Sequence, residues 1–240
     1  MRGLLTEGVK ILLIWNAIIF LLQQLLSGGL SFLDWDFVVR ARLHGMLQLL
    51  PYSVTRLEQL FGVVPVLVWQ KFFVWQLGSY MFLHGGLWHI FFNMFALWMF
   101  GTELERLWGS KRFLQYYFFT GVGAGILTVV LTPNSPIPTI GASGAIYGIL
   151  LAYAYYFPQR RIFLYFLFPI PARIFVIIIG VLAFLNSMGP SGGIAHIAHL
   201  GGLVFGYLFL RGGGWLNRLR GGRRRTIDFS RRDDDWGGGR

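Results

Sequence analysis

Apolar residues form long blocks along this chain, and short polar stretches separate the blocks. A helix needs about 20 mainly apolar residues to cross the roughly 30 Å hydrocarbon core of a bilayer, and most of the blocks approach that length. The pattern therefore predicts an all-α membrane protein built as a bundle of six spanning helices. The expected spans cover residues 9–26, 87–100, 113–131, 143–157, 174–188 and 194–210.

A long connection, residues 28–86, joins the first two expected spans. Charged residues such as Asp34, Arg42 and Glu58 make it too polar to span, yet residues 63–80 are apolar and aromatic. We interpret it as a membrane-associated first loop whose short helices lie in the plane of the membrane. Two further irregular stretches are expected, an aromatic, proline-broken segment at the interface (162–171) and a glycine-rich turn (189–193).

Lysine and arginine are unevenly divided between the two faces that six spans define. One face holds only Arg40, Arg42, Arg56 and Lys71, whereas the opposite face and the C-terminal tail hold the rest of the 21 basic residues. Cytoplasmic loops carry the excess of Lys and Arg, so we expect both termini in the cytoplasm. The expected location is the bacterial inner membrane, as an integral multi-pass protein.

Composition agrees with a membrane protein. Hydrophobic residues make up 55% of the chain and its mean hydropathy is +0.58, too apolar for a soluble domain of this size. The net charge of +11 would suit nucleic acid, but much of it lies in the tail beside the last span, where anionic lipid is nearer. We therefore expect the lipid bilayer, and no nucleic acid, as a partner. We expect a membrane domain over residues 1–215 and a basic, disordered cytoplasmic tail over residues 216–240.

A serine between glycines begins the shortest expected span, in the sequence Gly141-Ala142-Ser143-Gly144. At ~1.5 Å per residue, a helix over residues 143–157 is only about 21 Å long, roughly 9 Å less than the hydrocarbon core. Ser143 would therefore start a helix inside the membrane, near the outer face. Irregular backbone at that depth is tolerated only where it lines protein or a water-filled cavity.

Other polar side chains are expected at the same depth. His89 and Asn93 are four residues apart on one face of the second span, and the sixth span carries His196 and His199. Helix rise places them ~15–21 Å above the inner boundary, at the level of Ser143. Ionisable residues inside a membrane are candidates for function.

Spacing on the fourth and sixth spans would bring serine and histidine together. Gly202 and Gly206 form a small-xxx-small pattern that allows close approach of another helix. Tyr147, four residues after Ser143, would stack on the imidazole of His199.

Several other readings stay open on these residues. Ser143 would equally serve as a helix cap, and single membrane histidines often join helices. Zinc held by His196, His199 and His89 is a further option, although the His-Glu-x-x-His pattern is absent. A channel is disfavoured because the inner halves of the fourth and sixth spans are nearly all apolar. No Asp or Glu falls in the outer half of a span, which favours a Ser-His dyad over a Ser-His-Asp triad.

Over about residues 8–211 the chain resembles the rhomboid family of intramembrane serine proteases. Ser143 matches the nucleophile of the Gly-x-Ser-Gly motif. His199 matches the catalytic base in its His-x-x-Gly-x-x-x-Gly context, a spacing that fits it better than His196. His89 and Asn93 match the oxyanion-side His-x-x-x-Asn pair. Supporting positions of the family pattern are matched by Tyr147, Gly141, Gly144, Gly202, Gly206 and His84.

The resemblance implies an intramembrane serine endopeptidase with a rhomboid-like bundle and a Ser-His dyad, requiring no cofactor and no metal. Its substrates would be single-span membrane proteins, cleaved near the outer face and admitted beside the fifth span, where Phe184 lies. The alternative is a catalytically silent rhomboid-like protein that binds membrane helices. The chain has Trp75-Gln76 where many members have Trp-Arg, which leaves the anchoring of the first loop open.

Overall fold

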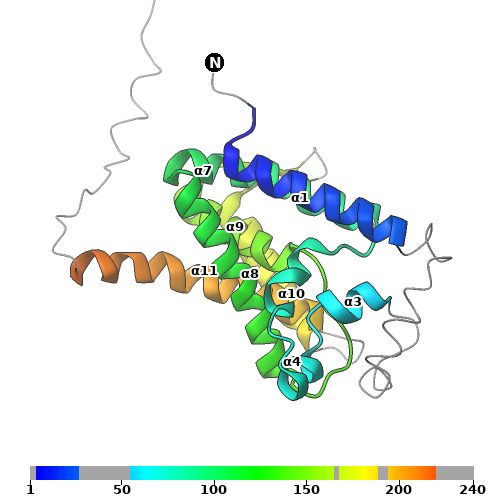
Figure 1. Cartoon of the computed structure of the whole chain (residues 1–240). Coiled ribbons are helices and arrows are strands. Elements are labelled where there is room, and N and C mark those ends of the chain that lie inside the picture. Colours follow the sequence, from blue (N-terminus) through cyan, green and yellow to red (C-terminus); the bar gives the residue numbers. More distant parts are fainter. Residues whose placement is uncertain (1–3, 27–54, 165–167, 189–193, 220–240) are drawn as a thin grey trace, which may run out of the picture.

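The computed structural model describes residues 4–26, 55–164, 168–188 and 194–219. The first part of the long loop, the expected turn at 189–193 and the tail beyond Leu219 lie outside the described residues. Within them the chain is mainly helical, as Figure 1 shows. Outside the first loop, the described helices are α1 (Glu7–Gln24), α6 (Leu87–Ala96), α7 (Thr102–Trp108), α8 (Ser110–Leu131), α9 (Ser143–Tyr156), α10 (Ala172–Ser187) and α11 (Ile194–Leu219).

Helices α8, α9 and α11 pack against one another at the centre of the molecule. Helix α9 is apolar on all sides, and nine of its 14 residues are buried, as expected for a helix enclosed by others. Small residues allow the close crossings: a Cβ added at Gly201 would lie 2.7 Å from Ala124 Cα, and one at Gly148 would lie 2.8 Å from Thr120 Cβ.

Helix α6 continues through a π-helical turn, η3 (Leu97–Gly101), directly into α7. The expected second span, residues 87–100, thus consists of α6 and most of the wide turn, and helical structure continues beyond it as α7. Beyond its apolar part, buried Glu105 accepts hydrogen bonds from the backbone N–H groups of Gly8 (2.7 Å) and Val9 (2.8 Å). This carboxylate therefore ties the start of α1 to α7.

The described part of the first loop contains short helices. Thr55 begins the first of them with a capping box completed by Glu58, an arrangement that satisfies two free N–H groups. The short elements are α3 (Arg56–Phe61), α4 (Pro65–Lys71), α5 (Gln76–Ser79) and the 3-10 turn η2 (Tyr80–Phe82).

Two stretches differ from the sequence expectation. Residues 162–171 contribute to an antiparallel hairpin of β1 (Arg161–Leu164) and β2 (Phe168–Pro171), in which Ile162 pairs with Ile170; prolines in this stretch disfavour helix. Helix α11 continues to Leu219, past Leu210, where the last span was expected to end.

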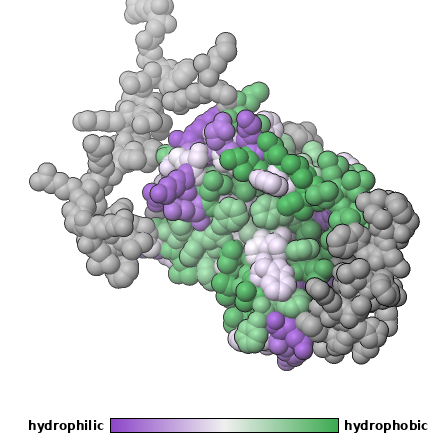
Figure 2. Space-filling view, viewed as in Figure 1, coloured by the Kyte–Doolittle hydropathy of each residue, from purple (hydrophilic) through white to green (hydrophobic). Residues whose placement is uncertain are grey.

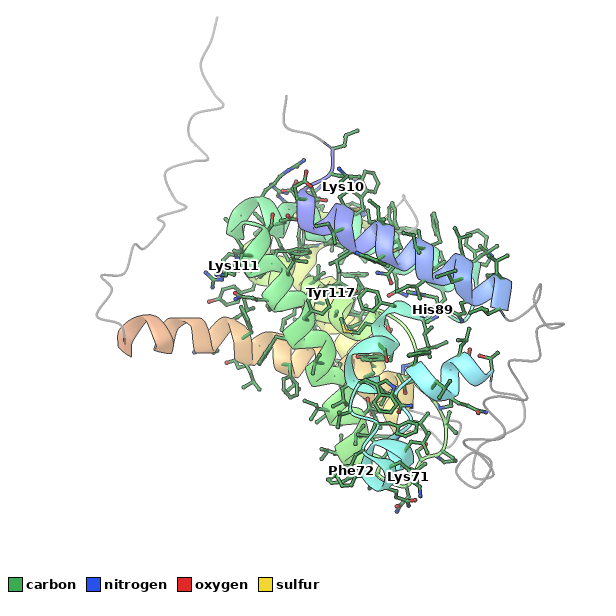
Figure 3. The ribbon with its side chains drawn as sticks, in the orientation of Figure 1. Lys10, Lys71, Phe72, His89, Lys111 and Tyr117 are labelled. Atoms are coloured by element: carbon green, nitrogen blue, oxygen red, sulfur yellow. The ribbon has the colours of Figure 1, made fainter. Side chains whose placement is uncertain are left out.

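The outer surface is apolar around the middle of the bundle. Figure 2 shows hydrophobic residues across the centre of one face, with hydrophilic groups gathered toward its two ends. Figure 3 shows Lys10 and Lys111 near the end where α8 begins, and Lys71 at the opposite end. Among the described helices, α1 and α8 are long and apolar enough to cross a membrane, and α10 is a shorter apolar helix.

Candidate active site

Ser143 is the first residue of α9, and its side chain points at a histidine of α11. The Oγ of Ser143 lies 2.9 Å from Nε2 of His199. Ala142 occupies the N-cap position, and no side chain caps this helix end. Ser143 is therefore not the cap of this helix.

The imidazole of His199 is stacked on Tyr147 of α9, with ring centroids 4.2 Å apart and planes 6° from parallel. Its Nδ1 atom is buried and has no hydrogen-bond partner among the described residues. His196, one turn earlier on α11, lies edge-on with its ring centroid 5.7 Å from that of His199. The structure thus joins Ser143 to His199, whereas His196 contacts the ring of His199.

Close packing of α9 and α11 brings the two residues within reach. A Cβ added at Gly202 would lie 1.9 Å from the carbonyl oxygen of Gly144, which follows Ser143 directly. A Cβ added at Gly206 would lie 2.7 Å from the hydroxyl of Tyr116. Real Cβ atoms do not approach backbone that closely, so glycine at 202 sets the distance between the helices that carry Ser143 and His199.

His89 lies on the other side of Ser143. Its Nδ1 accepts a hydrogen bond from the backbone N–H of Gly85 (3.2 Å), so a neutral ring carries its proton on Nε2. A Cβ added at Gly141 would lie 2.8 Å from that Nε2 and 3.7 Å from Ser143 Oγ. The φ angle of Gly141 is +121°, which side chains rarely adopt. The space above Gly141 is thus shared by the hydroxyl of Ser143 and a potential N–H donor.

The remaining predicted residues support this side of the site. Asn93 is buried, and its side-chain amide donates to the carbonyl oxygen of His89 at 2.8 Å. His84 is fully buried, and its ring packs edge-on against His89 at a centroid distance of 5.1 Å. The side chain of Gln23 in α1 pairs with both backbone groups of His84, at 2.9 and 3.1 Å. His84 therefore connects His89 to the far end of α1.

The described residues hold no group of three or more His, Asp or Glu side chains that would bind a metal ion. The described residues therefore give no support to the alternative of a zinc site. The histidines are arranged in two pairs with Ser143 between them, and not as a common set of ligands.

The family comparison covers more than half of the chain. Residues 71–214 match the Rhomboid domain, a range that includes Ser143, the four histidines of the site and Asn93. The chain belongs to the rhomboid family. It is therefore an all-α, multi-pass membrane protein, as its sequence predicted.

Similar rhomboid proteins come from distant organisms. The chain is 41% identical to rhomboid protease GluP of Bacillus subtilis over 136 residues, which are 55% of the chain and 25% of that protein. It is 33% identical to the mitochondrial rhomboid protein 1 of Saccharomyces cerevisiae over 141 residues, 56% of the chain and 39% of that protein. A presenilin-associated rhomboid-like protein of Rattus norvegicus is 32% identical over 149 residues, 57% of the chain and 38% of that protein. The matched region spans well under half the length of these relatives.

The departure from the rhomboid Trp-Arg pattern leaves the first loop anchored in this structure. Gln76 is fully buried; its Oε1 accepts from Val64 N–H (3.0 Å), and its Nε2 donates to the carbonyl of Gln59 (2.7 Å). The indole of Trp75 donates to the carbonyl of Leu60 at 2.8 Å. An uncharged amide thus holds the loop through its backbone.

Sequence analysis missed one residue that shapes this rhomboid site. The carbonyl of Tyr80 accepts a hydrogen bond from Gly141 N–H (2.9 Å), and its hydroxyl donates to the carbonyl of Gly121 (2.7 Å). Tyr80 therefore fixes the loop before Ser143 onto α8. No periodicity or motif indicates this role, because both contacts join segments far apart in the sequence.

Proposed function

We propose that this protein is an intramembrane serine endopeptidase that cleaves single-span membrane proteins near the outer membrane face. The observation that carries the proposal is the 2.9 Å contact between Ser143 Oγ and His199 Nε2. A serine hydroxyl is a weak nucleophile, and an adjacent base activates it. Membership of the rhomboid family and the 41% sequence identity to a rhomboid protease over 136 residues add independent support.

In the proposed reaction, Ser143 Oγ attacks the carbonyl carbon of the scissile peptide bond while its proton passes to His199 Nε2. When the tetrahedral intermediate collapses, the C–N bond breaks and His199 returns that proton to the leaving amine. A water molecule then attacks the acyl-enzyme with His199 as base and regenerates Ser143. These steps require a Ser-His dyad and no cofactor.

The developing oxyanion would lie in the space above Gly141. His89 Nε2–H points toward that space, and the backbone N–H of Ser143 belongs to the unbonded first turn of α9. The side-chain amide of Asn93 has two N–H groups. One donates to the carbonyl oxygen of His89, and the other would donate to the oxyanion. Loss of one such donor typically lowers kcat by about 10²–10³-fold.

We further propose a topology of six spans with both termini in the cytoplasm. The spans would be α1, the α6–η3 stretch, α8, α9, α10 and α11, and the first loop would lie against the membrane on the outer side. The distribution of basic residues supports this orientation. The bacterial inner membrane is the expected location, and a substrate helix would enter beside α10, where Phe184 is exposed.

The test compares the wild type with Ser143→Ala in liposomes that contain a single-span reporter substrate. We expect cleavage and fluorophosphonate labelling in the wild type, and neither in Ser143→Ala or His199→Ala. Ser187→Ala is the matched control, since this serine of α10 donates to its own helix at Phe184 O (2.6 Å) and should label like the wild type.

Full activity of Ser143→Ala would refute the protease proposal. A wild type that neither labels nor cleaves, but binds the reporter helix, would instead identify a catalytically silent rhomboid-like protein. Restoration of activity by zinc after chelation would show that the dyad mechanism is wrong.

A further inference from the structure

His199 lacks the partner that usually orients a catalytic histidine. In a Ser-His-Asp triad a carboxylate bonds Nδ1–H and fixes the direction of the ring. Here Nδ1 of His199 is buried without a hydrogen-bond partner among the described residues. Helices α8, α9, α10 and α11, which surround it, contain no Asp or Glu. Apart from its contact with Ser143, this imidazole must therefore be oriented by packing.

Two rings contact the imidazole, and they do so in different ways. Tyr147 lies parallel to it and covers one face. His196 is nearly perpendicular to it, with planes 81° apart. Because Tyr147 occupies the first face, the ring of His196 meets either the opposite face or an edge. In both cases the two neighbours together restrict rotation of the His199 side chain.

We propose that His196 is a positioning residue that, together with Tyr147, holds the His199 imidazole with Nε2 toward Ser143. This inference rests on the proposed function of Ser143 and His199 and goes beyond it. In the described part of the chain, His196 contacts the ring of His199, and the hydrogen bond to Ser143 is made by His199. His196 acts through the shape of its ring, and proton transfer by His196 has no part in the reaction.

The titratable groups around His196 are few. On α11 the neighbour is His199; Tyr147 of α9 stacks on His199, and His89 of α6 lies on the opposite side of Ser143. The charged side chains of α10 and α8, Arg173, Lys111 and Arg112, stand at or near the starts of those helices. No described acidic side chain on these helices would pair with His196, so its replacement by an uncharged ring leaves no charge unpaired.

Three variants separate packing from proton chemistry. His196→Ala removes the ring, His196→Phe keeps a ring that cannot carry a proton, and His196→Gln keeps hydrogen bonding without a ring. The interaction free energy of one aromatic pair corresponds to a change in rate of about 2- to 10-fold. We therefore expect His196→Ala to lower kcat by about that factor with KM unchanged. His196→Phe should restore kcat and keep the acidic limb of the pH profile, and His196→Gln should resemble His196→Ala.

A second measurement reports ring orientation without turnover. In protein labelled with ¹⁵N-histidine, the Nε2 resonance of His199 should keep its hydrogen-bonded position in His196→Phe and should shift or broaden in His196→Ala. Ser143→Ala identifies the resonance, since it removes the partner of Nε2.

The outcomes distinguish the two proposals. Wild-type rates and an unchanged His199 resonance in His196→Ala would overturn the positioning role. An active His196→Gln with an inactive His196→Phe would also overturn it and would assign His196 a hydrogen-bonding role. If the wild type itself is no more active than Ser143→Ala, the protease proposal fails, and the resonance of His199 still decides the role of His196.

Discussion

A single carboxylate, Glu105, joins the start of α1 to α7. It accepts hydrogen bonds from the hydroxyls of Thr6 and Ser110 and from the N–H groups of Gly8 and Val9. Glu105 lies beyond the apolar part of its helical stretch. Burial alone would raise the pKa of Glu105, but the hydrogen bonds from Ser110, Thr6, Gly8 and Val9 outweigh burial and leave this pKa below its ordinary value.

This shift predicts acid-sensitive stability. The folded chain binds the Glu105 proton more weakly than the unfolded chain, so the stabilisation is present above the unfolded pKa of about 4.3. It is lost as the pH falls through the lower pKa of the folded state. We expect Glu105→Gln to lower the free energy of unfolding by about 2 kcal/mol at pH 7 and by less at pH 3. Thermal melting in detergent measures this, with exposed Glu7→Gln as control; equal differences at both pH values would contradict the prediction.

A second prediction at the scale of single residues concerns Gln76. Gln76→Ala leaves the N–H of Val64 and the carbonyl of Gln59 without the amide that now bonds them. The N–H of Val64 would then lose its partner, and a buried polar group left unpaired costs about 1–3 kcal/mol, so the variant should melt at a clearly lower temperature. Gln24→Ala, at an exposed position of α1, should melt like the wild type. An unchanged melting temperature in Gln76→Ala would mean that the loop is held by its apolar contacts alone.

At the scale of helices, the approach of α11 to α9 depends on Gly202. A methyl group there would overlap the carbonyl of Gly144, and overpacking of this kind costs about 1–3 kcal/mol or displaces the helices. We expect Gly202→Ala to lower the proposed peptidase activity by at least about tenfold, because displacement separates His199 from Ser143 and each 1.36 kcal/mol corresponds to a factor of ten.

The matched control lies on the same helix. A Cβ added at Gly212 meets nothing within 4 Å, and alanine favours helix over glycine by about 1 kcal/mol. Gly212→Ala should therefore keep full cleavage of the reporter substrate. Equal activity of the two variants would show that the helices adjust without moving the site.

Sequence reasoning succeeded for features that local pattern determines. The loop before Gly141 and the apolar run after Ser143 predicted where α9 begins, and glycine spacing selected His199 over His196 as the partner of the serine. It failed where contacts between distant segments decide. The amide anchor at Gln76 and the Tyr80 contacts depend on partners elsewhere in the sequence. The hairpin at Arg161–Pro171, by contrast, pairs neighbouring segments, and its strands were missed because the prolines in this stretch predict irregular structure.

For the whole molecule, the proposed topology separates the basic C-terminal residues from the site by the thickness of a membrane. The hydrocarbon core is roughly 30 Å thick, and charge effects are screened beyond about 10 Å at 0.1 M salt. Truncation after Leu219, the last described residue of α11, should therefore leave turnover in neutral detergent nearly unchanged. In liposomes it should alter only behaviour that depends on anionic lipid and salt. A tenfold loss in detergent, with folding preserved, would place the C-terminal residues within the catalytic domain.

The π-helical turn η3 sets the rotational phase between the two ends of its helix. Buried positions recur every four residues, at Asn93, Leu97, Gly101 and Glu105. In a regular α-helix four residues turn about 400°, which is about 40° more than one full turn. Three such steps would therefore move the buried position by about 120° around the helix axis. The wide turn accommodates roughly one additional residue and cancels about 100° of that drift. Deletion of half-exposed Met99 would remove the additional residue and convert the turn to regular helix, which restores the same phase between Asn93 and Glu105. Glu105 should then still face α1, and melting of the deletion variant should keep the acid-sensitive stability that Glu105→Gln loses.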